Sequence, residues 1–358
     1  MAHYGKRIIG FIVPLLSILM AILIGAIIIV CLGANPLTAL QSLVMGAFGS
    51  KANIGTTLAK ATPLIFTGLC ACFAYKCGVF NLGGEGQFIV GSIAACYVTL
   101  LTGMTGLAAT VLALLAAAVA GGLWGFIPGI LKIARGQNEM IISIMFNYIA
   151  TLLMGVVYTN WLREGSVPQT QAVPKASQLP RIIPGMRVTW GFVISIALGL
   201  IIFYFLYRTS GGFKLRAVGL NSTAARFNGF PVRRFVLISF VISGAIAGLG
   251  GGVELLGAQF RLINGYAAGY GFDGVAMALI GQLHPIATIF AAIFFAALRA
   301  GATTMQAAVG VPTSVSDIIQ ALVIVFTVAG LALTNISPSF EEFLLRLTHG
   351  TRKEGAKA

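Results

Sequence analysis

Long stretches of apolar residues, separated by short polar segments, follow one another along the whole chain. The first runs from Ile8 to Leu32 without a charged residue. An α-helix needs roughly 20 residues to cross the apolar core of a bilayer, so a stretch of this length predicts a membrane span. The apolar residues are continuous, whereas strands of a membrane β-barrel alternate in polarity. The pattern therefore predicts an all-α, polytopic transmembrane helical bundle.

The same criterion, applied along the chain, predicts about ten spans, some of them broken helices. They are Ile8–Leu32, Leu58–Tyr75, Phe80–Leu101, Leu107–Ala134, Met140–Asn160, Thr189–Tyr207, Phe235–Leu256, Phe272–Gln282, Pro285–Ala300 and Val315–Thr334. The eighth is short enough to be a half-helix. An even number of spans places both termini on the same side of the membrane.

Composition agrees with a membrane protein. Hydrophobic residues make up 58% of the chain and charged residues 9%, and the mean hydropathy is +0.95. A soluble domain carries about 25% charged residues. Lys6 and Arg7 precede the first apolar run as in a signal peptide, but the run is too long for one and no cleavage site follows it. We expect an uncleaved first span.

The distribution of charge predicts the orientation. The net charge is +14, and Lys and Arg gather on the cytoplasmic side of membrane proteins. With the N-terminus inside, most of the 23 basic residues fall in inner segments, which favours an N-in/C-in topology. We therefore attribute the positive charge to a protein of the lipid bilayer and expect no nucleic acid as a partner.

One transmembrane domain is expected over residues 1–340, followed by a cytoplasmic tail over residues 341–358 to which no role is assigned. The outer loop 161–188 contains four prolines and should be extended and irregular. The inner loop 208–234 is basic and contains a short helix with its own start and stop signals. Asn221 is a good N-cap, Gly229 suits the left-handed end, and Pro231 prevents continuation. This helix is either a docking element for a cytoplasmic protein or an amphipathic surface helix without a partner.

Acidic residues at membrane depth are few and are costly in lipid. They are Glu85, Glu139, Glu254, Asp273 and Asp317. Glu85 lies in the glycine-rich run 80–87, which is expected to interrupt a helix. A second glycine-rich acidic run, 269–274, occupies the other half of the chain, and paired broken segments are typical of transporters built from inverted repeats. An equal alternative to a role in transport is a polar knot, meaning a network of polar side chains that only holds two helices together.

Several kinds of chemistry have no support in the sequence. There is no P-loop, no HExxH motif and no recognisable nucleophile, so the chain is expected to be no enzyme and to bind no cofactor. The scattered histidines and the five cysteines, which we interpret as small packing residues, predict no metal site. Gly244, Gly248 and Gly252 form one stripe along the seventh span, which favours close helix packing.

Three segments resemble the permease subunits of bacterial ABC importers, in the branch that takes up simple sugars and nucleosides. They are FNLGGEGQ at 80–87, NEMIISIMFNYIA at 138–150 and LRAVGLNSTAARFNGFP at 215–231. The likeness covers roughly residues 8–339 and is strongest to the permeases of nucleoside importers. It implies a protein of the bacterial cell membrane that imports a small molecule by alternating access.

The resemblance also implies partners. They are a second homologous permease, a cytoplasmic ATPase with two fused cassettes that binds ATP and Mg²⁺, and an extracytoplasmic substrate-binding lipoprotein. The capped helix would be the coupling helix to the ATPase, formed by Asn221, Ser222, Thr223, Ala224, Ala225, Arg226, Phe227, Asn228 and Gly229. Candidates for the translocation path are Asn81, Glu85, Gln87, Asn147 and Asp273.

Two other functions stay open from the sequence alone. The first is a secondary transporter, driven by an ion gradient without an ATPase, in which Glu85 or Asp273 would bind the ion. The second is an intramembrane enzyme, for which no catalytic set is visible. The sequence does not distinguish nucleosides from ribose or hexoses, nor a pair of identical permeases from a pair of different ones.

Overall fold

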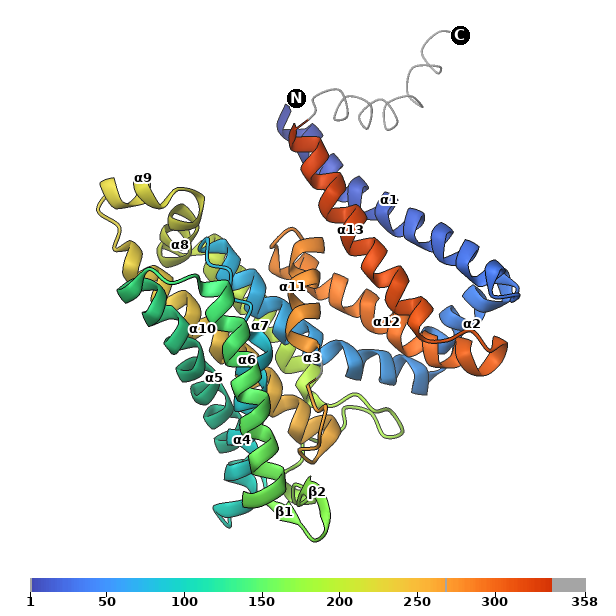
Figure 1. Ribbon diagram of the computed structural model, residues 1–358, viewed down its shortest axis with the longest axis horizontal. Coiled ribbons are helices and arrows are strands. Elements are labelled where there is room, and N and C mark those ends of the chain that lie inside the picture. The colour runs from blue at the N-terminus through green and yellow to red at the C-terminus, as the bar shows by residue number, and fades with distance from the viewer. Residues whose placement is uncertain (1, 268, 337–358) are drawn as a thin grey trace. The chain divides into compact units, whose positions relative to one another are not determined.

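The computed structural model describes residues 2–267 and 269–336 and is built almost entirely of helices (Figure 1). The predicted all-α fold is confirmed. The predicted tail, residues 341–358, lies outside the described residues. The single domain predicted over residues 1–340 stays a prediction.

Nine helices in the described ranges are long and apolar enough to cross a membrane. They are α1 (Ala2–Cys31), α3 (Lys51–Lys76), α4 (Gly84–Leu101), α5 (Leu107–Arg135), α6 (Glu139–Val156), α7 (Trp190–Arg208), α10 (Val232–Glu254), α12 (Pro285–Val309) and α13 (Ser314–Ile336). Short π-helical turns, η1 (Val157–Trp161) and η3 (Leu255–Gln259), extend α6 and α10. Each long helix coincides with a predicted span, although the ends differ by several residues.

Four helices are shorter: α2 (Pro36–Phe48), α8 (Ser210–Leu220), α9 (Ser222–Phe227) and α11 (Tyr270–Ile280). Helix α11 is the expected half-helix, because its 11 residues span only about 16 Å at ~1.5 Å per residue. Helices α2 and α8 were not predicted. Pro36 stands at the first position of α2, where its missing N–H removes no helical hydrogen bond.

The chain forms two compact units. The first combines residues 1–46 with the chain from residue 298 onward, and α1 packs along α13 within it. At Gly25 the contact is so close that an added Cβ would lie 2.6 Å from the Ile319 side chain. The second unit comprises residues 47–297 and contains every residue discussed below as part of a site.

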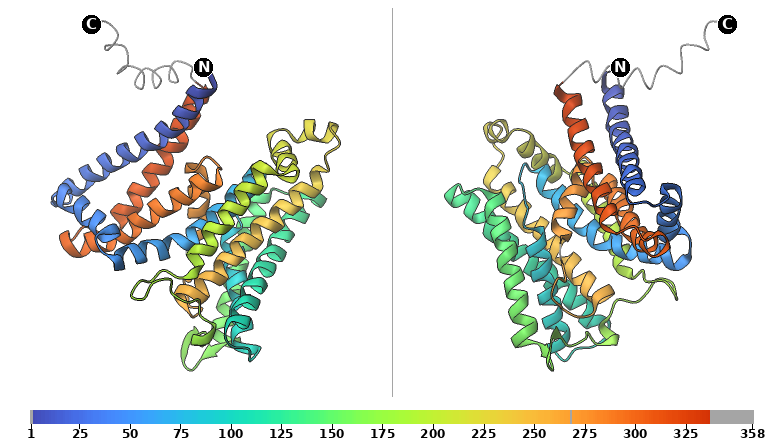
Figure 2. Two further views of the ribbon diagram at one scale, coloured as in Figure 1. Left: turned by 180° about the vertical axis from the view of Figure 1, so that it is seen from behind. Right: turned by 45° about the vertical axis from the view of Figure 1, so that its right-hand side comes forward.

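Three helices of the second unit, α4, α5 and α10, pack closely on one another and run side by side in both Figure 1 and Figure 2. Glycines allow this contact. A Cβ added at Gly91 of α4 would lie 2.3 Å from the Gly248 carbonyl oxygen, and one at Gly248 would lie 2.4 Å from the Ala117 carbonyl oxygen of α5. Backbone therefore packs on backbone along the predicted glycine stripe of α10.

The loop 161–188 is largely irregular, as its prolines predict. It also contains a two-stranded antiparallel hairpin, β1 (Arg163–Glu164) and β2 (Val167–Thr170), and a 3₁₀ turn, η2 (Lys175–Ser177). The hairpin was not predicted. An ion pair between Glu164 and Arg261 attaches the hairpin to the segment that follows η3.

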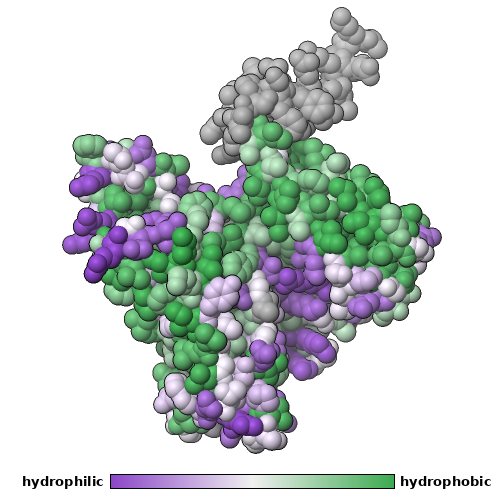
Figure 3. Space-filling model, viewed as in Figure 1, coloured by the Kyte–Doolittle hydropathy of each residue, from purple (hydrophilic) through white to green (hydrophobic). Residues whose placement is uncertain are grey.

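The surface of the second unit is apolar between two polar ends. Figure 3 shows hydrophilic residues over α8 and α9 at one end and over the β1–β2 hairpin at the other, with hydrophobic surface between them. Many large apolar side chains on the long helices are exposed, among them Leu115, Leu123, Leu152 and Ile201. A surface of this kind fits helices surrounded by lipid.

Candidate functional site

A non-helical turn, residues 77–83, joins α3 to α4 inside the bundle. Asn81 donates through Nδ2 to Ser243 Oγ of α10 (2.8 Å) and to Gln87 Oε1 (3.1 Å), while its Oδ1 accepts from the backbone N–H of Gly83 (2.9 Å). Asn81 and Gln87 are both fully buried. The glycine-rich run thus precedes α4 and forms its first turn, whereas the sequence was interpreted as an interruption within a helix.

Asn147 of α6 holds the same turn from the other side. Its Oδ1 accepts from the N–H of Gly86 (2.8 Å), and its Nδ2 donates to the carbonyl of Leu82 (2.9 Å). Asn147 lies eight residues after the start of α6 at Glu139, about 12 Å along that helix. The turn is therefore folded back to membrane depth, where irregular backbone requires protein partners.

Glu85 links this turn to the second glycine-rich run. Its Oε1 accepts from the N–H of Gly269 (2.8 Å) and its Oε2 from the N–H of Gly271 (2.5 Å), at the N-terminus of α11. Asp273 lies in the first turn of α11 and is half-buried. The two glycine-rich acidic runs singled out in the sequence therefore meet in space.

The five predicted path residues consequently share one neighbourhood, and four of them are buried. The partners of Asn81, Glu85, Gln87 and Asn147 come from the chain itself. This arrangement favours the polar knot over a lining exposed to a passing solute. Ser243 belongs to the same network and was missed, because a serine inside an apolar helix gives no distinguishing signal in the sequence.

Helices α8 and α9 form the second feature. Asn221 ends α8, and its Oδ1 accepts from the N–H of Ala224 (2.9 Å) at the start of α9. Gly229 has a φ of +77°, as its predicted position requires. The predicted start and stop signals of the short helix are confirmed. Whether α9 docks a cytoplasmic protein depends on which side chains it exposes.

Two large apolar side chains stand out on that surface. Leu220 and Phe227 are 88% and 87% exposed, whereas Ala225 of α9 is buried. A groove beside them is lined by Ser222, Thr223, Arg226, Phe227 and residues 230–234, which include Arg233 and Arg234. Exposed apolar side chains rimmed by polar and charged residues mark an interaction site.

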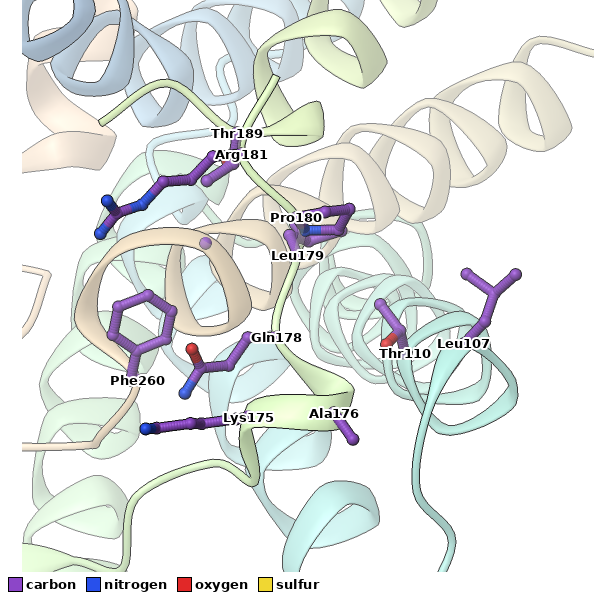
Figure 4. Close-up of a pocket in the computed structure, with 11 residues that line it drawn as sticks. Leu107, Thr110, Lys175, Ala176, Gln178, Leu179, Pro180, Arg181, Thr189 and Phe260 are labelled. Atoms are coloured by element: carbon purple, nitrogen blue, oxygen red, sulfur yellow. The ribbon is translucent and has the colours of Figure 1, made fainter. Parts of the chain in front are cut away.

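A cavity of about 520 Å³ lies at the other end of the second unit, between the α5 start and the loop 175–181. In Figure 4, Gln178 lies between Phe260 and Lys175, and Arg181 reaches along the same side. Lys175 and Arg181 are exposed cations. The cavity was not predicted, because its walls come from segments far apart in the sequence.

The described residues contain no group of three or more His, Cys, Asp or Glu side chains that could hold a metal ion. Cys70, Cys72, Cys77 and Cys96 are free and buried, which fits their interpretation as packing residues, while Cys31 is exposed.

Comparison with known proteins identifies relatives. The family described as "Branched-chain amino acid transport system / permease component" matches residues 53–328. The chain is 36% identical over 334 residues to the guanosine ABC transporter permease NupP of Bacillus subtilis, covering 92% of this chain and 96% of NupP. It is 32% identical to the glucose ABC transporter permease TsgB13 of Haloferax volcanii, covering 88% and 86%. A second guanosine permease of B. subtilis, NupQ, is 31% identical over 68% of this chain and 79% of NupQ. No solved structure matches.

Proposed function

Since this chain belongs to the family of branched-chain amino acid transport system permease components, we propose that the solute it imports is a nucleoside. It is a transport subunit of an ABC importer, a multi-pass protein of the bacterial plasma membrane, and not an enzyme. The observation that carries the choice of nucleosides is the end-to-end likeness to NupP, named as a guanosine permease. The 32% identity to TsgB13, named as a glucose permease, makes a hexose the second candidate.

The importer contains a partner permease. NupP and NupQ are both named as guanosine permeases of one organism, and this supports a pair of different but homologous subunits. The proposed motor is a cytoplasmic ATPase with two fused cassettes, which binds ATP and Mg²⁺, and the proposed donor of solute is an extracytoplasmic binding lipoprotein. An ion-driven carrier receives no support, because each of these relatives is named as an ABC permease.

Helix α9 and its caps, residues 221–229, are proposed as the coupling helix. The support is the combination of a firmly capped helix with exposed Phe227 and the basic groove beside it. In the proposed mechanism, cassette closure displaces this helix, the two permeases rock, and solute passes between them. The five predicted path residues lie near the translocation path in this proposal: Asn81, Glu85, Gln87, Asn147 and Asp273. Their buried hydrogen-bond network holds the helices that border the path in fixed positions.

The test of the coupling role replaces Phe227 by glutamate in cells that express the whole importer. Uptake of labelled guanosine should fall about tenfold or more, because the variant removes a large apolar contact side chain and puts a charge in its place, while membrane insertion stays normal. The matched control is Val167→Glu, since Val167 on β2 is 51% exposed and lies in the other polar end. Ala224 is exposed and suits a second variant, whereas Ala225 is buried and would disturb the loop itself.

Two results would count against the proposal. Wild-type uptake by the Phe227→Glu variant would contradict the coupling assignment. Uptake of labelled glucose in place of guanosine by the wild-type importer would reject nucleosides and leave the permease role intact.

A further inference from the structure

Helix α11 begins inside the bundle. It has 11 residues, about a third of the number in a long span such as α5, and its first turn lies beside the turn that Asn147 holds at membrane depth. The first N–H groups of any helix have no partner within the helix, and in a membrane interior an unsatisfied N–H is costly. Gly269, the residue before α11, has no side chain with which to cap it.

Glu85 supplies the missing acceptors from another helix. Its two carboxylate oxygens accept from Gly269 and Gly271, which are 184 and 186 residues away in sequence. A carboxylate at a helix N-terminus is also stabilised by the helix dipole. Since Glu85 is only 8% exposed, both oxygens are engaged within the protein, and the side chain is placed to hold α11 rather than to meet a solute.

The backbone contacts around this carboxylate are equally close. A Cβ added at Gly271 would lie 2.3 Å from the Glu85 backbone nitrogen, and one at Gly274 would lie 2.5 Å from atoms of Thr67 on α3. Beside them the rings of Phe88 and Tyr270 are 5.6 Å apart. The first turn of α11 is therefore packed on α4 and α3 and fastened there by a charged group.

We propose that Glu85 is a positioning residue for transport. Its carboxylate holds the N-terminus of the half-helix α11 against α4, so that both helices move as one body during alternating access. This inference rests on the proposed transport function. It assigns Glu85 a role different from lining the path. A path-lining residue would affect the affinity for solute, whereas a positioning residue affects how efficiently ATP hydrolysis is converted into movement.

The variant that separates these roles is Glu85→Gln. It keeps the size of the side chain but has one acceptor oxygen in place of two, and its NH₂ group would face the N–H of Gly271. The whole importer, reconstituted in liposomes, gives uptake and ATP hydrolysis together. We expect the number of solute molecules carried per ATP to fall about tenfold or more with KM unchanged, because loss of the charge-assisted hydrogen bond to Gly271 loosens α11 from α4 while the ATPase continues to hydrolyse ATP.

The matched control is Glu254→Gln. Glu254 is also buried, at 5% exposure, but accepts from Gln259 of the segment that directly follows it. The control should keep the wild-type ratio, because the amide oxygen can still accept from Gln259. Equal losses in both variants would overturn the proposal, because loss of any buried charge would then suffice. A change in KM alone, or wild-type coupling in Glu85→Gln, would overturn it as well.

Hydrogen exchange keeps the proposal testable if Glu85→Gln fails to assemble. In the unmodified importer, the amides of residues 269–271 should exchange as slowly as those in the middle of α10, and rapid exchange would overturn the cap. ATP-driven uptake by the unmodified importer is measured in the same preparation. Its absence refutes the transport function, while its presence with rapid exchange refutes the role of Glu85 alone.

Discussion

The backbone contact between α4 and α10 can be tested by adding a single carbon atom. In Gly91→Ala, the new Cβ would lie 2.3 Å from the carbonyl oxygen of Gly248 and 2.4 Å from its Cα. Contacts between an aliphatic carbon and a carbonyl oxygen have a separation of about 3.3 Å or more. The two helices would therefore have to separate by about 1 Å, because no side chain at Gly248 can rotate away.

The expected energy follows from that overlap. Overpacking of a tight contact costs about 1–3 kcal/mol, while alanine gains up to about 1 kcal/mol over glycine in a helix. Gly155→Ala in α6 is the matched control, because it has the same gain and its nearest neighbour, the Tyr158 hydroxyl, would be 3.9 Å away. The difference between the two variants then isolates the overlap.

The assay is thermal unfolding of the purified protein in detergent, followed by tryptophan fluorescence. The Tm of Gly91→Ala should lie about 2–12 °C below that of Gly155→Ala, at the ~2–4 °C per kcal/mol typical of larger proteins. Equal Tm values in the two variants would refute the reasoning, since they would mean that α4 and α10 are not in backbone contact.

Two further predictions concern the pH dependence of stability and the orientation in the membrane. Burial and the nearby Lys76 lower the pKa of His284, so His284 binds a proton more readily in the unfolded chain than in the folded one. The contribution of His284 to stability is therefore present above about pH 6.5 and is lost as pH falls through the lowered pKa. His284→Phe should therefore reduce the drop in Tm between pH 7.5 and 5.5, and identical pH profiles would exclude His284 as the cause. For the orientation, Lys175→Cys should react with an impermeant maleimide in intact cells and Thr223→Cys only after permeabilisation, both in a Cys31→Ser background. The opposite labelling pattern would invert the N-in topology.

The sequence predicts the long helices well because lipid imposes a simple rule on them. A helix such as α7 is apolar on all faces, so its length and composition alone identify it. Helix α8 escapes the same rule, since its sequence SGGFKLRAVGL is glycine-rich and weakly apolar. The caps of α9 were predictable because Asn221, Gly229 and Pro231 act locally.

The candidate site shows the limit of local patterns. The two acidic glycine-rich runs could be singled out, but their meeting at Glu85 depends on folding that brings together residues 184 positions apart. Gly271 is required by its closeness to Glu85, not by its own φ, and no pattern within its segment reports such a neighbour. Long-range contacts of this kind are set by the packing of whole helices and become visible only in three dimensions.

The exposed side chains of α8 and α9 have a consequence for the life of the protein before assembly. Leu220 and Phe227 are almost fully exposed. In the proposed orientation, a newly inserted chain without the proposed ATPase would display these two large apolar side chains to the cytoplasm. Such surfaces promote aggregation and attract chaperones and proteases. An unassembled subunit would therefore expose a surface that favours its degradation, and binding of the proposed ATPase would cover that surface.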